Sequence, residues 1–355
     1  MEKRKANFEL LRIIAMLMIV CLHYLSKGKL LSETFSISDL DGISYWLIEA
    51  FCIVAVNSYV IMSGYFRVDK GFNIKNIIKI WMQVLFYSIM IPLILIIFNV
   101  INIEELNIYR ISIYFFPIIS EHYWFITYFI LLMLIAPILN AGLKNLSQKD
   151  ARNCIIGMII LLSVAKSVLP IEISFDKSGY DLSWFVCLYL IGGYIKLYGI
   201  RYFSNLSKSV ITYMGLSVIT MVIMLVYSEI GKSVAAIDKV KDNCYDYNHI
   251  IVLMASIAFF YIFYYIRVNG RFLANIITKI SPYVLGVFLL HEHIELRYLW
   301  VEWANISAEG SILMRTLHMI ITILVIFICG VLVEYIRVNL YSLVSNVLSK
   351  SLSTR

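Results

Sequence analysis

The sequence predicts an all-α integral membrane protein with about ten transmembrane helices and with both termini in the cytoplasm. Of the 355 residues, 61% are hydrophobic and only 15% are charged, whereas soluble globular domains carry about 25% charged residues. The apolar residues recur along the whole chain in runs long enough to cross a bilayer. The short loops between these runs differ in charge between the two faces, which indicates their orientation.

The apolar runs define the helices in chain order. Each window holds roughly 18–24 residues, the length that a helix needs to cross the hydrocarbon core. No linker rich in proline, glycine or serine divides them, and the loops of the predicted outer face are too short to fold alone. We therefore expect residues 1–355 to form a single transmembrane domain with no appended soluble domain. The windows fall at about 8–26, 43–64, 76–100, 118–140, 153–170, 182–199, 209–228, 247–268, 276–295 and 312–336.

The loop charges give the predicted orientation. Most of the 30 basic residues fall on the face that holds both termini, whereas most of the acidic residues fall on the opposite face. Basic residues in short loops mark the cytoplasmic side, so we expect cytoplasmic termini in a multi-pass protein of the plasma membrane. The net charge of +7 is therefore a topology signal, and it predicts no nucleic-acid partner.

The first apolar run and the cysteines each have a second interpretation. Lys3-Arg4-Lys5 before an apolar stretch is also typical of a signal peptide, but no small-residue cleavage pattern follows Leu25, which favours a retained helix. The six cysteines fall mostly within the spans without close pairing. We expect neither a disulfide framework nor a metal site, and no permanently bound cofactor.

Two ionisable residues lie on the first helix, within FELLRIIAMLMIVCLHYL at positions 8–25. Arg12 and His23 are eleven positions apart, so at about 100° per residue they project within about 20° of each other, with a rise of about 16 Å. Arg12 alone could be a snorkelling residue and His23 an interhelical hydrogen-bonding residue. Their shared face favours a polar path, because ionisable groups are costly within a bilayer.

Further polar residues are predicted at the two levels that Arg12 and His23 mark. The segment SGYFRVDK brings Arg67 and Lys70 to the cytoplasmic boundary near Arg12. Three cations at one inner mouth suit an anionic ligand such as a nucleotide or phosphate, although the positive-inside rule also places cations there.

The outer level collects histidines, carboxylates and aromatic residues. Histidine can exchange a proton near neutral pH, and a neighbouring acid can orient it. The tryptophans could form a sugar-binding face, although an interfacial aromatic belt predicts them equally well. No glycine-rich phosphate loop, metal-spaced cluster or serine-elbow motif is present, so histidine, carboxylates and arginine must carry any chemistry. The outer residues are Glu49, His122, Trp124, Asp181, Trp184, His291 and Glu292.

The chain resembles the acyltransferase-3 family of membrane acyltransferases over nearly its whole length. The arginine and histidine of the first helix and the SGYF-R segment are the more specific features. The aromatic and aliphatic matches are weaker. The motifs that carry the resemblance are VNSYVIMSGYF, HYWFITYFILLMLIAP, WFVCLYLIGGYI and SPYVLGVFLLH.

The resemblance implies transfer of an acyl group, commonly acetyl from acetyl-CoA, to a hydroxyl of a cell-surface glycan or a lipid-linked sugar. The family's essential histidine corresponds to His23, and its first-helix arginine to Arg12. Its arginine pair after the second span corresponds to Arg67 and Lys70, where lysine keeps the charge but loses the bidentate fork. Many members add a soluble esterase-like domain after the last helix, which we do not expect here.

These residues together give a mechanistic hypothesis. Arg12, Arg67 and Lys70 would hold the phosphates of acyl-CoA, whose arm extends along the first helix to His23. His23 would act as general base, oriented by Glu49 or Glu292, although a covalent acyl-imidazole relay is also possible. His122, Trp124, Asp181, Trp184 and His291 would lie on the acceptor side.

Two other classes of protein compete with this hypothesis. A helix bundle with intramembrane Arg, His and Glu also describes a proton-coupled transporter or a flippase of a sugar or lipid-linked glycan. The absence of a visible inverted repeat and the histidines gathered at one level argue against a transporter. A polysaccharide polymerase or ligase would normally carry a large external loop, which this sequence lacks.

Overall fold

The structure, a computed structural model, describes residues 5–31, 40–169, 176–238, 240–306 and 310–353, and Lys3 and Arg4 of the predicted inner face lie outside these ranges. Within them every regular element is helical, and nine helical segments are long and apolar enough to cross a membrane. A shorter apolar helix, α9, accounts for the predicted window at 182–199. The prediction of an all-α membrane protein is therefore confirmed. The elements are α1 (Ala6–Lys27), α2 (Leu40–Cys52), α3 (Val54–Arg67), α4 (Ile74–Ile97), η1 (Ile103–Glu105), α5 (Ile108–Phe115), α6 (Trp124–Asn145), α7 (Gln148–Ile159), η2 (Ile160–Val164), α8 (Ala165–Val168), α9 (Leu182–Tyr198), α10 (Leu206–Gly231), α11 (Ala235–Asp238), η3 (Lys241–Tyr245), α12 (Ile250–Tyr265), α13 (Arg271–Ile280), η4 (Ser281–Tyr283), α14 (Val284–His291), α15 (Leu299–Trp303) and α16 (Ile312–Ser353).

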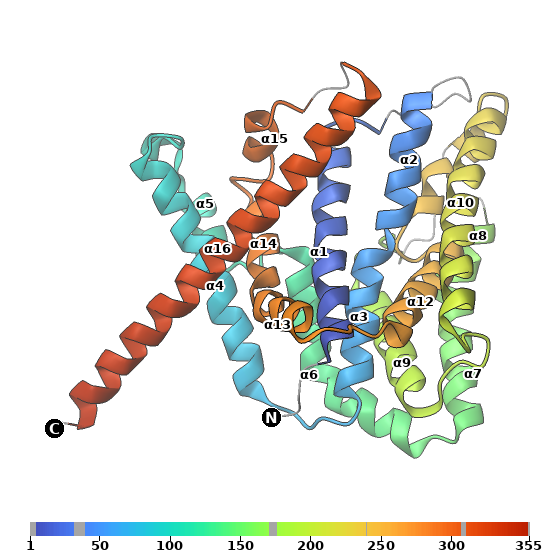
Figure 1. The fold of residues 1–355 in the computed structure, drawn as a ribbon, viewed down its shortest axis with the longest axis horizontal. Helices are drawn as coiled ribbons and strands as arrows, with labels where there is room; N and C mark the ends of the chain where they lie inside the picture. The colour runs from blue at the N-terminus through green and yellow to red at the C-terminus, as the bar shows by residue number, and fades with distance from the viewer. Residues whose placement is uncertain (1–4, 32–39, 170–175, 239, 307–309, 354–355) are drawn as a thin grey trace.

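Helix α1 occupies the centre of the bundle. It packs against α2, α3, α12, α13, α14 and α16, and Figure 1 shows it between α3 and the long diagonal helix α16. The start of α1 and the last turns of α16 both lie at the lower end of Figure 1. The number of crossings and the assignment of that end to the cytoplasm stay predictions.

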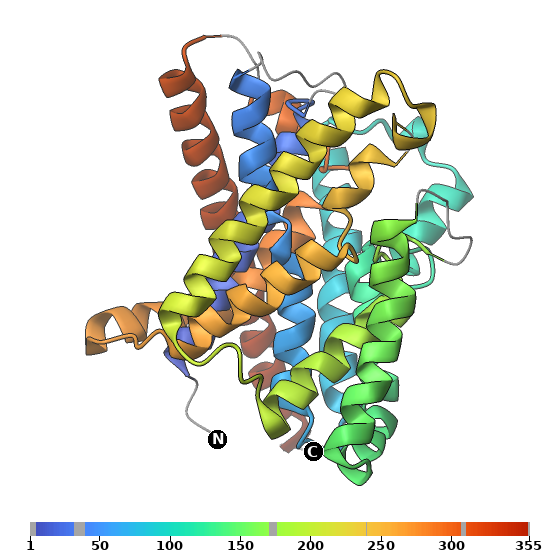
Figure 2. The same cartoon turned by 90° about the vertical axis from the view of Figure 1, so that its right-hand side faces the viewer.

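The predicted span over 276–295 is divided into two helices of different direction. Helix α13 lies crosswise at the edge of the bundle, as Figure 2 shows at the lower left, and the chain turns at Ser281, Pro282 and Tyr283 before α14 begins. Proline fits the first positions of the new helix because its missing N–H would have no partner there. Helix α14 then ends at His291, so the turn after it, beginning at Glu292, is brought against α1.

Close glycine contacts fix the helix that carries Arg67. A Cβ atom on Gly64 of α3 would lie 2.0 Å from the backbone oxygen of Tyr189 on α9, and one on Gly192 of α9 would lie 2.0 Å from the backbone oxygen of Ile61. Small residues allow membrane helices to approach at backbone distance, where van der Waals packing holds them. The end of α3 is therefore held rigidly against α9.

The helix that carries His291 is held in the same way. A Cβ atom on Gly330 of α16 would lie 2.4 Å from Cα of Val287, and one on Gly286 of α14 would lie 2.4 Å from Cβ of Glu334. Helix α14 is thus packed between α16 and the central helix α1. This packing sets the position of His291 relative to α1.

Candidate functional site

A cluster of ionisable side chains joins α1 to the end of α14. His23 Nδ1 lies 2.9 Å from Nε2 of His291 and 3.2 Å from Oε1 of Glu292. Lys27, one helical turn beyond His23, forms an ion pair with Glu292. Its ammonium also lies 5.9 Å from the centre of the Tyr298 ring. The sequence prediction that His23, His291 and Glu292 share a level therefore corresponds to direct contact.

The hydrogen bonds assign the protons of the two imidazoles. His291 Nδ1 lies 2.6 Å from the backbone oxygen of Val287, and a carbonyl oxygen can only accept, so Nδ1 of His291 carries a proton. In a neutral imidazole Nε2 of His291 is then the acceptor, and Nδ1 of His23 must donate to it. Oε1 of Glu292 lies 3.2 Å from the same nitrogen of His23.

This proton assignment leaves Nε2 of His23 with a free lone pair. No hydrogen bond of the described residues engages this atom, and the His23 side chain keeps 19% of its surface exposed. His291 is buried behind it. The cluster can therefore accept a proton at Nε2 of His23 and stabilise the resulting imidazolium through Glu292.

The end of α1 that carries Arg12 is hydrogen-bonded to the turn that precedes α14. Nη1 of Arg12 lies 3.2 Å from Oε2 of Glu9, and the hydroxyl of Ser281, in the turn before α14, donates to Glu9. Tyr59 donates to the backbone oxygen of Arg12 at 2.5 Å. The Arg12 side chain is 37% exposed, so its guanidinium is anchored by an acid while part of it stays accessible.

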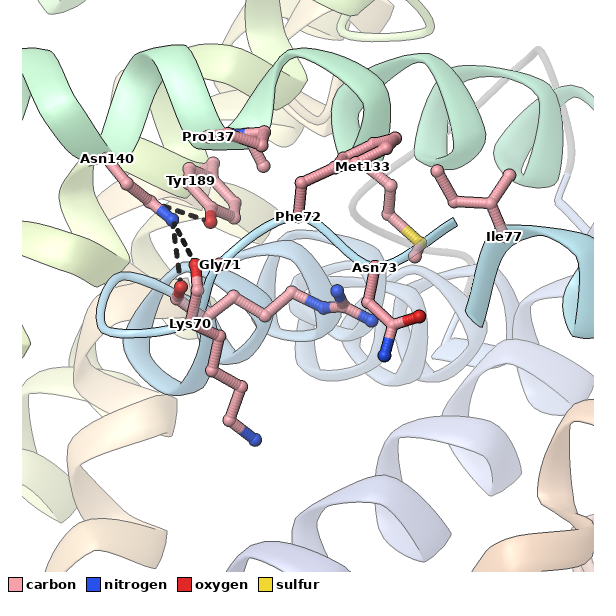
Figure 3. A pocket seen from close by; sticks show the side chains of 11 residues that line it. Lys70, Gly71, Phe72, Asn73, Ile77, Met133, Pro137, Asn140 and Tyr189 are labelled. Carbon is pink, nitrogen blue, oxygen red and sulfur yellow. Dashed lines mark hydrogen bonds between the residues drawn. The ribbon is translucent and has the colours of Figure 1, made fainter. Parts of the chain in front are cut away.

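Arg67 and Lys70 line one pocket at the end of α3, shown in Figure 3. Asn140 of α6 organises this turn: its amide nitrogen donates to the backbone oxygens of Arg67 at 2.9 Å and Lys70 at 3.3 Å, and its Oδ1 accepts from Tyr189 at 2.9 Å. The oxygen of Arg67 also accepts the backbone N–H of Lys70 at 2.9 Å, so Asn140 adds to a turn that the backbone closes at the end of α3. The pocket is lined by Arg67, Lys70, Gly71, Phe72, Asn73, Ile77, Met133, Ala136, Pro137, Asn140 and Tyr189.

This pocket combines two cations with an apolar wall. Arg12 does not line it, although its charge is felt at Arg67. A pocket of this kind suits a ligand with phosphate groups and a planar or aliphatic part. The predicted phosphate-binding trio is therefore divided into Arg67 and Lys70 in the pocket and Arg12 beside it.

Of the two acids predicted to orient His23, the structure brings only Glu292 to it. Glu49 is buried, and among the described residues no hydrogen bond joins it to His23. It lies instead within electrostatic range of Cys21. Cys21 precedes His23 by two positions and so points to roughly the opposite side of α1. Glu49 therefore faces a different part of the bundle.

His122 lies beside His293 and braces the turn after α14. His122 Nε2 accepts from the backbone N–H of Ile294 at 3.0 Å, and its Nδ1 lies 3.3 Å from the hydroxyl of Ser88. Burial, together with the nearby charges of His293 and Arg297, lowers the pKa of His122 to about 2. Burial likewise lowers the pKa of His293 to about 3. Both imidazoles are therefore neutral at physiological pH, and their contacts hold the turn that carries Glu292.

The remaining outer residues lie around α9. Trp184 is fully buried and donates to Asn57 at 3.1 Å, whereas Asp181 caps α9 by accepting from the backbone N–H of Trp184 at 3.0 Å. Trp124 packs against Tyr180, with ring centres 4.4 Å apart, and Tyr180 is 41% exposed. Trp124 and Tyr180 therefore offer an accessible aromatic surface, while Trp184 belongs to the core.

Three contributing residues were not identified from sequence. Lys27 follows His23 by four positions, so its place on the same helical face is readable from the spacing. Asn140 is an amide inside an apolar span, which is a signal for a hydrogen-bonding role. Glu9 lies three positions before Arg12, the spacing of an ion pair within a helix.

The comparisons with known proteins agree with this arrangement. The acyltransferase-3 family model, described as an acyltransferase domain, matches residues 5–335. The comparison with curated proteins gives no match, and neither does the comparison with solved structures. The match covers nearly the whole chain and includes both α1 and the segment that carries His291 and Glu292. The chain therefore belongs to the acyltransferase-3 family of multi-pass membrane acyltransferases.

Proposed function

We propose that the chain moves an acetyl or other short acyl group from cytoplasmic acyl-CoA to a hydroxyl of an extracytoplasmic or lipid-linked cell-surface glycan. The observation that carries the proposal is the free Nε2 of His23: the hydrogen bond to His291 makes Nδ1 the donor nitrogen, and Glu292 lies beside it. Such an imidazole is a general base with its proton already assigned. Family membership supplies the acyl-transfer class, and the donor, the acceptor and the plasma-membrane location are parts of the proposal.

The donor is proposed to enter from the end of α1 that carries Arg12. Arg67 and Lys70 would hold the phosphates of coenzyme A in the pocket below α3, and Arg12 would add a third positive charge beside it. The helical rise from Arg12 to His23 is about 16 Å. A long, thin pantetheine arm that follows α1 would bring the thioester to His23. No permanently bound cofactor is required for this chemistry.

The transfer step follows from the proton assignment. Nε2 of His23 removes the proton of the acceptor hydroxyl while the oxygen attacks the thioester carbonyl carbon. The carbon–sulfur bond then breaks, and the leaving coenzyme A thiolate takes the proton back from Nε2. Glu292 stabilises the imidazolium between these two events because its carboxylate lies 3.2 Å from Nδ1 of His23.

The acceptor is proposed to approach from the outer side of the cluster. The exposed aromatic surface at Trp124 and Tyr180 suits the apolar face of a sugar ring. In this proposal His122, Asp181 and Trp184 support the acceptor side by holding the turn after α14 and the start of α9. His291 acts behind His23 as the residue that fixes its tautomer.

A vesicle experiment tests the function. Radiolabelled acetyl-CoA is supplied to inside-out membrane vesicles that contain either wild-type protein or His23→Ala, and label in glycan is measured. The proposal expects label transfer by wild type and none by His23→Ala. Equal transfer by the two proteins would contradict the assignment of His23. Glycan that crosses the membrane without gaining label would favour the transporter or flippase alternative.

The same lone pair could attack the thioester directly and form an acyl-imidazole. Incubation with labelled donor in the absence of acceptor separates the two routes. The general-base route predicts no label on the protein, whereas label that is retained on wild type and lost in His23→Ala would establish the covalent relay.

A further inference from the structure

The three side chains at the α1–α14 junction also have the composition of a metal site. His23, His291 and Glu292 each offer one ligand atom, and these atoms lie within 4.8 Å of one another in the described part of the chain. Two histidines and one glutamate are a ligand set that binds zinc with the fourth position open. No spacing along the sequence predicts this ligand set, because His23 and His291 are 268 positions apart.

Two of the three separations between the ligand atoms fit a tetrahedral ion. Zinc–nitrogen bonds of 2.0–2.1 Å place neighbouring ligand atoms about 3.3 Å apart. His23 Nδ1 lies 2.9 Å from Nε2 of His291 and 3.2 Å from Oε1 of Glu292. An ion could therefore replace the shared proton with small side-chain movements and no change in the helices.

The surroundings of His291 match those of a metal ligand. Ligating histidines usually donate their other ring N–H to a carbonyl or carboxylate, which fixes the ring and its tautomer. His291 does this through Nδ1 to the backbone oxygen of Val287 at 2.6 Å. Its Nε2 is thereby presented as a lone pair, the form that a metal ion requires.

Lys27 supplies a competing positive charge. Its ammonium forms an ion pair with Glu292, and a divalent ion would have to displace it from that carboxylate. The ammonium of Lys27 thus occupies the place beside Glu292 that a metal ion would take. This competition argues for a weak, reversible metal site and against a resident metal.

We propose that His23, His291 and Glu292 form a reversible inhibitory site for a first-row divalent metal ion of the zinc type. Coordination of Nδ1 of His23 transfers the single imidazole proton to Nε2 by exchange with water. The imidazole stays neutral, but the lone pair that accepts the hydroxyl proton is lost. Binding of the ion stands independently, whereas inhibition rests on the proposed function of His23.

Cobalt(II) is a suitable probe, since its visible absorption reports ligands and tetrahedral geometry without any activity measurement. We expect the purified full-length protein to bind one Co²⁺ with a tetrahedral spectrum that Zn²⁺ abolishes by competition. His291→Phe should weaken the affinity at least tenfold. Lys27→Met should strengthen it several-fold, because the competing ammonium is removed. His318→Gln is the matched control, since His318 bonds Tyr24 and lies outside the cluster, and it should bind like wild type.

The outcomes separate the metal site from the proposed function. Absence of the tetrahedral spectrum in wild type, or equal affinity in correctly folded His291→Phe, would overturn the metal site. Monodisperse elution and an unchanged melting temperature establish that the variant is folded. In the vesicle assay Zn²⁺ should inhibit transfer, and a chelator should restore it. Zinc that binds by competition yet leaves the transfer rate unchanged would overturn the inhibitory role.

Discussion

Nδ1 of His23 lies 3.2 Å from Oε1 of Glu292, so a carboxylate from the turn after α14 meets the histidine of the first helix. Each member of the pair has a second partner. The hydrogen bond to His291 makes Nδ1 of His23 the donor nitrogen, and Lys27 forms an ion pair with Glu292. The pair therefore resembles the base and orienting acid of other acyl-transfer enzymes in its geometry.

Glu292→Gln tests the orienting carboxylate. The amide keeps the size of the side chain but removes the charge that stabilises the imidazolium, so the rate of transfer should fall about 10²-fold. Donor affinity should not change, because Glu292 lies far from the phosphate pocket along α1. The rate and the acetyl-CoA affinity of purified protein check this prediction. Glu302→Gln, an exposed acid on α15, is the matched control and should retain full activity.

Asn140→Ala tests the organisation of the donor pocket. Loss of the amide removes its hydrogen bonds to the backbone oxygens of Arg67 and Lys70, and the turn that sets the spacing of the two cations is held less firmly. The KM for acyl-CoA should rise about tenfold with kcat nearly unchanged, the pattern of lost uniform binding. Asn145→Ala on the same helix is the control, since its amide bonds only Ala141 within α6. Equal KM values for the two variants would contradict the role of Asn140.

Gly64→Ala tests the contact between α3 and α9. The added methyl group would lie 2.0 Å from the backbone oxygen of Tyr189, so the helices must separate at a cost of about 3 kcal/mol. The melting temperature in detergent should fall clearly. A Cβ atom at Gly142 meets no atom within 4 Å, so Gly142→Ala should leave the melting temperature unchanged or raise it. Similar melting temperatures for both variants would disprove the close packing.

Glu295 should give the protein an acid-dependent stability. Burial alone would raise the pKa of Glu295, but hydrogen bonds from Arg110 and Tyr114 outweigh it and lower the pKa. A carboxyl group whose pKa is lowered by folding stabilises the fold at pH values above its pKa in the unfolded chain, about 4.3. This stabilisation is lost as the pH falls through the pKa of the group in the folded protein. Wild type should therefore melt above Glu295→Gln at pH 7, and the difference should vanish in acid. Glu104→Gln, at an exposed site, should show no such pH-dependent difference.

The helices were largely predictable from the sequence because apolar length is a local property. The windows lie close to the nine candidate spans and the shorter helix α9 of the described residues, whereas the position of the termini relative to the membrane stays a prediction. The division of the predicted span at 276–295 was not predicted, because composition does not reveal that α13 lies crosswise at the edge of the bundle. The turn at Ser281–Tyr283 sets the direction of α14 and therefore the position of His291. This turn depends on packing against α16.

The site was predictable only in part, because spacing along a helix is a local property whereas contacts between helices depend on tertiary packing. The shared face of Arg12 and His23 follows from helical spacing, but the choice between Glu49 and Glu292 needs the tertiary arrangement. Both acids were expected at the outer level, and only the direction in which each helix faces brings Glu292 to His23. Asn140 was missed because its function lies in contacts with α3, which no spacing within α6 reveals.

In the proposed mechanism Arg12 serves the donor, and His23 performs the transfer. Acetyl-CoA binding and label transfer, measured together on purified Arg12→Ala and His23→Ala, test it most directly. We expect His23→Ala to bind acetyl-CoA as tightly as wild type and to transfer no label, and we expect Arg12→Ala to bind the donor more weakly. Transfer by His23→Ala at the wild-type rate would contradict the account.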